Sequence, residues 1–85
     1  MITYRIYTER KPNVGEIVSQ YFDGFTLIPT EGYWKGKREE SVIVEVIASG
    51  PMRQKVREMA ETLKEINGQE SVLVVESDAV VPQFV

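Results

Sequence analysis

The chain contains neither cysteine nor histidine among its 85 residues. Disulfides, thiolate chemistry, imidazole acid–base catalysis and zinc sites built from these ligands are therefore excluded. Phosphate-binding glycine loops and carboxylate triads are also missing from the sequence. We expect no metal and no cofactor. The lack of cysteine also favours a cytoplasmic protein, because disulfides are rare in that compartment.

Long apolar runs and an excess of positive charge are missing as well. No apolar run approaches about 18 residues and no charged-then-apolar leader precedes the first strand, so we expect neither a signal peptide nor a membrane partner. The formal net charge is −3. A chain of this charge is not expected to bind nucleic acid.

The length indicates one domain over residues 1–85, with residues 78–85 as a C-terminal tail. A chain this short buries only about 60–65% of its unfolded surface, so its core is marginal alone. Small domains compensate with disulfides, metals or partner subunits. Only the partner remains here, and we expect a homo-oligomer, either a dimer or a trimer.

Hydrophobic periodicity predicts six elements in the order strand, helix, strand, strand, helix, strand. Apolar alternation marks strands, and apolar residues at helical spacing mark the two helices. Pro29 within the second strand indicates an edge strand or a bulge. This order predicts an α+β, ferredoxin-like βαββαβ fold with an antiparallel sheet of strand order 4-1-3-2 and both helices on one face. The expected ranges are 2–8, 12–22, 25–34, 41–48, 52–66 and 71–76, with Ser49 or Gly50 capping the second helix.

The sheet face away from the helices is predicted to be unusually apolar. Alternation leaves several aliphatic side chains and one tyrosine there, and exposed apolar patches generally mark interfaces. Glu45 lies among them, either as a carboxylate of raised pKa or paired with Arg5 across the sheet. A partner subunit is favoured as the cover; the tail, with Val80, Val81 and Phe84, is the alternative. The candidate interface residues are Tyr7, Ile43, Glu45, Ile47, Leu73 and Val75.

Two further groups are candidate ligand sites. Trp34, Lys35, Lys37 and Arg38 could stack a ring and neutralise a small anionic ligand, although a solvated hairpin tip is the more common explanation of such a segment. Gln69 and Glu70 could form a polar site before the last strand, with Glu70 paired to a hairpin cation. The alternative is a turn in which Gln69 or Ser71 satisfies free backbone groups. Arg10 and Lys11 are expected to be solvated charges.

The stretches G-Y-W-K-G-K-R-E-E-S at residues 32–41 and G-Q-E-S-V-L at residues 68–73 resemble a family of small uncharacterised bacterial proteins. That family carries G-x-W-x-G, then R-E-x-S, and G-Q-E-S-V-L, which opens its last strand. The resemblance covers about two thirds of the chain and implies the same fold, without an activity. A weaker, fold-level similarity is to the PII and CutA proteins, which are trimers with a functional loop between the second and third strands.

These features favour a non-enzymatic binding or interaction module that assembles as a homo-oligomer through its sheet face, with a small ligand or a protein as partner. The alternatives are a small cofactor-free enzyme of the dimeric α+β barrel type, such as a monooxygenase-like protein, and a PII- or CutA-like ligand sensor. A virus-encoded inhibitor is a further idea, suggested only by small size and acidity. A closed pocket lined by Trp34, Tyr21 or Phe22 together with a buried polar group would favour the enzyme, and a filled core would favour the binding module.

Overall fold

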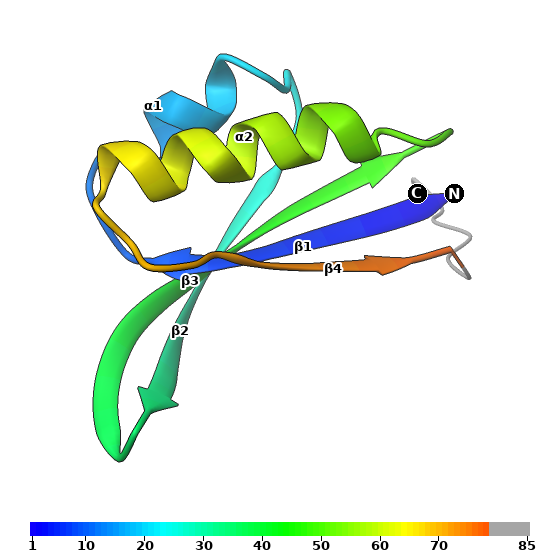
Figure 1. Cartoon of the computed structure of the whole chain (residues 1–85). Coiled ribbons are helices and arrows are strands. Elements are labelled where there is room, and N and C mark those ends of the chain that lie inside the picture. Colours follow the sequence, from blue (N-terminus) through cyan, green and yellow to red (C-terminus); the bar gives the residue numbers. More distant parts are fainter. Residues whose placement is uncertain (79–85) are drawn as a thin grey trace.

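Two α-helices cover one face of a four-stranded antiparallel sheet in the computed structural model, which describes residues 1–78 (Figure 1). The predicted α+β class, antiparallel sheet and two-helix layer are confirmed. Residues 79–85 lie outside the described part, and with them the alternative that the tail covers the sheet. The elements are β1 (Ile2–Glu9), α1 (Val14–Ser19), β2 (Thr26–Trp34), β3 (Lys37–Ala48), α2 (Arg53–Ile66) and β4 (Leu73–Ser77).

The sheet has the strand order β2-β3-β1-β4, or β4-β1-β3-β2 when it is read from the other edge. This arrangement is compatible with the ferredoxin-like fold. Every neighbouring pair of strands is antiparallel, and Tyr7 of β1 lies opposite Ile43 of β3 on one side and Leu73 of β4 on the other. β2 is an edge strand, so Pro29 within it costs the sheet no central ladder hydrogen bond.

The core lies between the helices and the sheet. Ile6 and Val44 are fully buried at the centre of the sheet, and Met59 and Leu63 of α2 are fully buried above them. Each such side chain stabilises the fold by about 1.5–3 kcal/mol when it leaves water. Because successive strand residues point to opposite faces, every second residue of β1 and β3 lies on the face away from this core.

The first helix is shorter than predicted. α1 ends at Ser19, although the apolar pattern continues to Phe22, which is buried in a turn that follows the helix. Tyr21 contributes a hydrogen bond of 2.6 Å between its hydroxyl and that of Thr62 on α2. Burial of Phe22 therefore does not require a continuous helix up to that residue.

The predicted cap of the second helix is wrong. Met52, rather than Ser49 or Gly50, is the N-cap residue, and it makes no side-chain capping bond. Its backbone N–H donates instead to the Tyr4 hydroxyl at 2.9 Å, so a side chain from β1 satisfies the free donor. At the other end, Gly68 has a φ of +63° and follows the helix stop as predicted, whereas Ile66 is exposed rather than part of the buried stripe.

The β2–β3 hairpin is longer than predicted. β3 begins at Lys37 rather than at residue 41, because Trp34 and Lys37 pair directly across a two-residue turn. Lys35 and Gly36 both have positive φ, 50° and 78°, as hairpin turns of this length require. Arg10 is not simply solvated: its guanidinium donates to the carbonyls of Thr30 and Ser41 at 2.7 and 3.1 Å. Figure 1 shows the hairpin bending away from the helix layer.

Within residues 1–78, no helix is both long enough and apolar enough to cross a membrane.

Candidate functional site

The face of the sheet opposite the helices carries an apolar row that crosses all four strands. Leu73, Tyr7, Ile43 and Ile28 occupy consecutive positions across β4, β1, β3 and β2 in the register of the sheet. Leu73 is 60% exposed and Ile28 is 36% exposed, whereas the two central residues are half-buried by their neighbours. We call these four residues the apolar row.

The other predicted interface residues lie on the same face, beside the apolar row. Val75 follows Leu73 two positions along β4, and Ile47 lies further along β3. Between Ile47 and Ile43, Glu45 accepts a hydrogen bond from the Arg5 Nε at 3.0 Å. The predicted pairing of Glu45 with Arg5 across the sheet is therefore observed. The pair divides the apolar surface into a larger part around the row and a smaller part at Ile47.

A hollow of about 470 Å³ lies at one end of this face, between the bent hairpin and the turn that leads into β4. Three aromatic side chains line it: Trp34, Tyr33 and Tyr7. Leu73 also lines it, so the hollow and the apolar row share two residues. We call this space the hairpin hollow; among residues 1–78, the charged side chains that line it are Glu9, Glu39 and Glu70.

Gln69 fixes one wall of the hairpin hollow. Its side-chain oxygen accepts from the Glu9 backbone N–H at 3.2 Å, and its side-chain nitrogen donates to the Thr8 hydroxyl at 2.6 Å. This double contact ties the turn before β4 to the end of β1. Of the two alternatives for this segment, the backbone-satisfying turn is the one observed, and Gln69 rather than Ser71 supplies the contact. Glu70 lines the hollow without the predicted hairpin cation beside it.

The predicted cations do not line the hairpin hollow. Arg38 is ion-paired with Glu31 of the facing strand, and this contact raises the pKa of the guanidinium further. Lys37 is exposed at the start of β3. Lys35 places its Nζ 5.7 Å from the centre of the Trp34 ring, within the range of a cation–π interaction. The predicted grouping of Trp34 with three cations is thus reduced to Trp34 and Lys35.

One residue of the apolar row and two that line the hairpin hollow escaped the sequence analysis. Ile28 is hidden in the sequence because Pro29 follows it and breaks the alternation. In the sequence, Glu39 is one of four consecutive charged residues that were expected in the hairpin loop. The structure places it in β3. Tyr33 shares the hollow with Trp34 although neighbouring strand residues normally face opposite ways. Only the observed strand boundaries show that Glu39 and Tyr33 lie at the same hollow.

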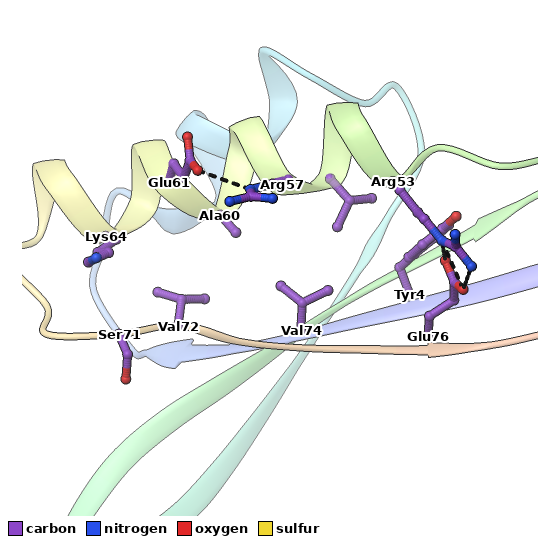
Figure 2. A pocket seen from close by; sticks show the side chains of 11 residues that line it. Tyr4, Arg53, Arg57, Ala60, Glu61, Lys64, Ser71, Val72, Val74 and Glu76 are labelled. Atoms are coloured by element: carbon purple, nitrogen blue, oxygen red, sulfur yellow. Dashed lines mark hydrogen bonds and ion pairs between the residues drawn. The ribbon is translucent and has the colours of Figure 1, made fainter.

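A second, larger groove of about 610 Å³ lies between α2 and β4 (Figure 2). Val74 of β4 and Val72, which directly precedes this strand, point toward α2 and form an apolar floor with Ala60. Val74 stays 40% exposed, because α2 leaves the edge strand partly uncovered. At one end, Arg53 binds both carboxylate oxygens of Glu76, the shortest contact being 2.7 Å.

The ion pairs at the rim of this groove set its charge. The hydrogen bonds from Arg53 hold the pKa of Glu76 below its ordinary value, and the same contact raises the pKa of Arg53. Arg57 donates to Glu61 one turn later at 3.2 Å. The groove thus combines an apolar floor with two ion pairs at its rim, and Lys64 is a further charged residue that lines it.

No family model matches the chain, and no curated protein matches it. Among solved structures, the chain is similar to a phage SAM lyase in the apo state, with a TM-score of 0.68 and 19% identity over 89% of this chain and 78% of that one. It is also similar to the de novo designed protein Foldit4, with a TM-score of 0.52 and 14% identity over 93% and 96% of the two chains. At such identities the likeness establishes the fold alone.

Proposed function

We propose that this chain is a ferredoxin-like interaction module that associates with further copies of itself through the open face of its sheet. The observation that carries the proposal is the apolar row, which runs without interruption from Leu73 on one edge strand to Ile28 on the other. A sheet face that meets water normally alternates with polar residues. A row of this kind loses its contact with water when a second copy packs on it.

The size of the face supports the proposal. A specific interface takes about 800 Å² from each partner. The described chain extends 37 × 24 × 20 Å, so its broad face has an area of that order. Self-association also supplies the extra buried surface that a chain of 85 residues needs. The Arg5–Glu45 pair would fix the register, because each charge must keep a partner when water is removed.

The core supports a binding module more than a barrel-type enzyme. Phe22 is buried in the core and Tyr21 contacts α2, whereas Trp34 lies at the far end of the hairpin. These three aromatic residues therefore do not line one pocket. Residues of both helices and of the central strands fill the space between the layers.

A matched set of substitutions tests the assembly face. Leu73→Glu and Ile28→Glu change the two ends of the apolar row, and Ile66→Glu changes an aliphatic residue at the end of α2 that is as exposed as Leu73. We expect light scattering to show dissociation for the first two variants, because a buried unpaired carboxylate costs several kcal/mol, and the wild-type mass for the third. Equal masses for all three variants would refute the sheet face as the interface.

Cleavage of SAM is a second candidate function. The fold is shared with the phage SAM lyase, and the hairpin hollow is the observation that favours it here. SAM carries an adenine ring, and the exposed rings of Trp34 and Tyr33 provide surfaces on which such a ring can stack. The test is to incubate the protein with SAM and follow its consumption by chromatography, with Trp34→Leu as the comparison. Consumption by the wild type alone supports this function, and unchanged SAM refutes it.

A further inference from the structure

We propose that the hairpin hollow binds an organic cation of the quaternary ammonium class. The proposal concerns the site of the second candidate function, but it requires neither cleavage nor self-association. It starts from the charges on the walls: Glu9, Glu39 and Glu70 line the hollow. The sequence had suggested an anionic ligand at this hairpin, and the lining observed here favours the opposite sign.

Two of these carboxylates are available to a ligand. Glu9 lies 3.6 Å from the Lys11 Nζ, so part of its charge is already balanced. Glu39 and Glu70 are exposed and, within residues 1–78, neither forms an ion pair with a lysine or arginine. A cation between them gains favourable electrostatic energy without displacing an internal partner.

The aromatic rings select a bulky cation. The face of an aromatic ring attracts a cation within about 6 Å of its centre, tryptophan most strongly, and such rings bind methylated ammonium groups. Trp34, Tyr33 and Tyr7 are the aromatic residues that line the hollow. The ring of Trp34 already attracts the ammonium of Lys35 at 5.7 Å. The same ring can therefore attract a ligand cation, with Lys35 as its internal competitor.

The hollow is also shaped in advance. Gln69 holds the turn before β4 against β1 through its two hydrogen bonds, and Arg10 holds the hairpin to the same strand end through two carbonyls. Because these walls are already fixed, less conformational entropy is lost when a ligand binds between them. About 470 Å³ is ample for a choline-sized group.

Choline and its neutral isostere 3,3-dimethyl-1-butanol test the proposal directly, since they share a shape and differ in charge. Trp34 is the only tryptophan of the chain, so its fluorescence reports on this site. We expect choline to change the fluorescence saturably, about tenfold more tightly than the isostere at equal ionic strength. Saturation-transfer NMR on the choline methyl groups provides a second measurement that does not depend on Trp34.

Neighbouring carboxylates supply the matched variants. Glu39→Gln and Glu70→Gln should each weaken choline binding severalfold, whereas Glu40→Gln, which alters a carboxylate outside the hollow, should not. Lys35→Asn should tighten binding, because asparagine suits the positive φ of the turn and removes the competing ammonium. Equal binding of the isostere, equal loss in Glu40→Gln, or binding of inorganic phosphate in place of choline would overturn the proposal. A failure of the protein to cleave SAM would refute the second candidate function but would not contradict the binding of choline.

Discussion

Tyr7 and Leu73 lie opposite each other on β1 and β4, and both belong to the apolar row and to the hairpin hollow. A second copy packed on the row would therefore border the hollow. Substitutions at these two positions affect the assembly face and the ligand site together. Ile28 and Glu39 each belong to one of them only, so they separate the two proposals.

Tyr4 is predicted to stabilise the start of α2. Its hydroxyl accepts the Met52 backbone N–H at 2.9 Å, and its ring is buried. Tyr4→Phe leaves that N–H without an acceptor, which costs about 1 kcal/mol or more. The melting temperature should fall by about 4–8 °C. Tyr33→Phe removes the hydroxyl of an exposed tyrosine and is the control; an equal fall in both variants would contradict the capping role.

Lys37 and Arg38 are predicted to contribute little to folding and nothing to cation binding. The Arg38–Glu31 pair is exposed on the hairpin, where ion pairs are strongly screened. The double variant Lys37→Ala, Arg38→Ala should keep its melting temperature within a few degrees of the wild type and should bind choline unchanged. A large thermal destabilisation would show that the pair is structural, and lost choline binding would show that it belongs to the ligand site.

Glu76 is predicted to make stability depend on pH in the acidic range. Arg53 lowers its pKa in the folded state from the ordinary value of 4.5. The stabilising contribution is thus fully present above the unfolded pKa and is lost as the pH falls through the lower, folded pKa. The melting temperature of Glu76→Gln should lie slightly below that of the wild type at neutral pH, and the difference should vanish on acidification.

The control for this comparison is Glu65→Gln, which changes an exposed carboxylate on α2. Its melting curve should follow that of the wild type at every pH. A gap between Glu76→Gln and the wild type that stays constant on acidification would contradict the assignment to Glu76.

The sequence predicted the faces of the central strands well. The alternation in β1 and in the part of β3 from residue 41 onward placed Tyr7 and Ile43 on the open face, because these stretches are most deeply buried on the helix side. The predicted ranges of the two helices were close at their starts, since Pro12 and Pro51 mark the entry regions and an apolar stripe marks each helix. The alternation of a strand can be recognised from the sequence without knowledge of the tertiary structure.

Long-range contacts were beyond the sequence analysis. Gln69 acts on Thr8 and Glu9, about 60 residues away, and nothing in its local sequence identifies those partners. Arg10 looked like a solvated charge for the same reason. The predicted hairpin was too short because its charged residues have low strand propensity. In the structure, these residues pair with β2 across the turn and therefore belong to β3.

Sedimentation equilibrium of the wild-type protein over a range of micromolar concentrations tests the central claim most directly. The apolar row predicts an average mass of at least twice 9.7 kDa at the upper end of the range. Because association is reversible, this mass should decrease on dilution below the dissociation constant. In parallel, the fluorescence of Trp34 should shift to the red as the oligomer dissociates, since its ring lies beside the assembly face. A mass of 9.7 kDa at every concentration would contradict self-association through the sheet.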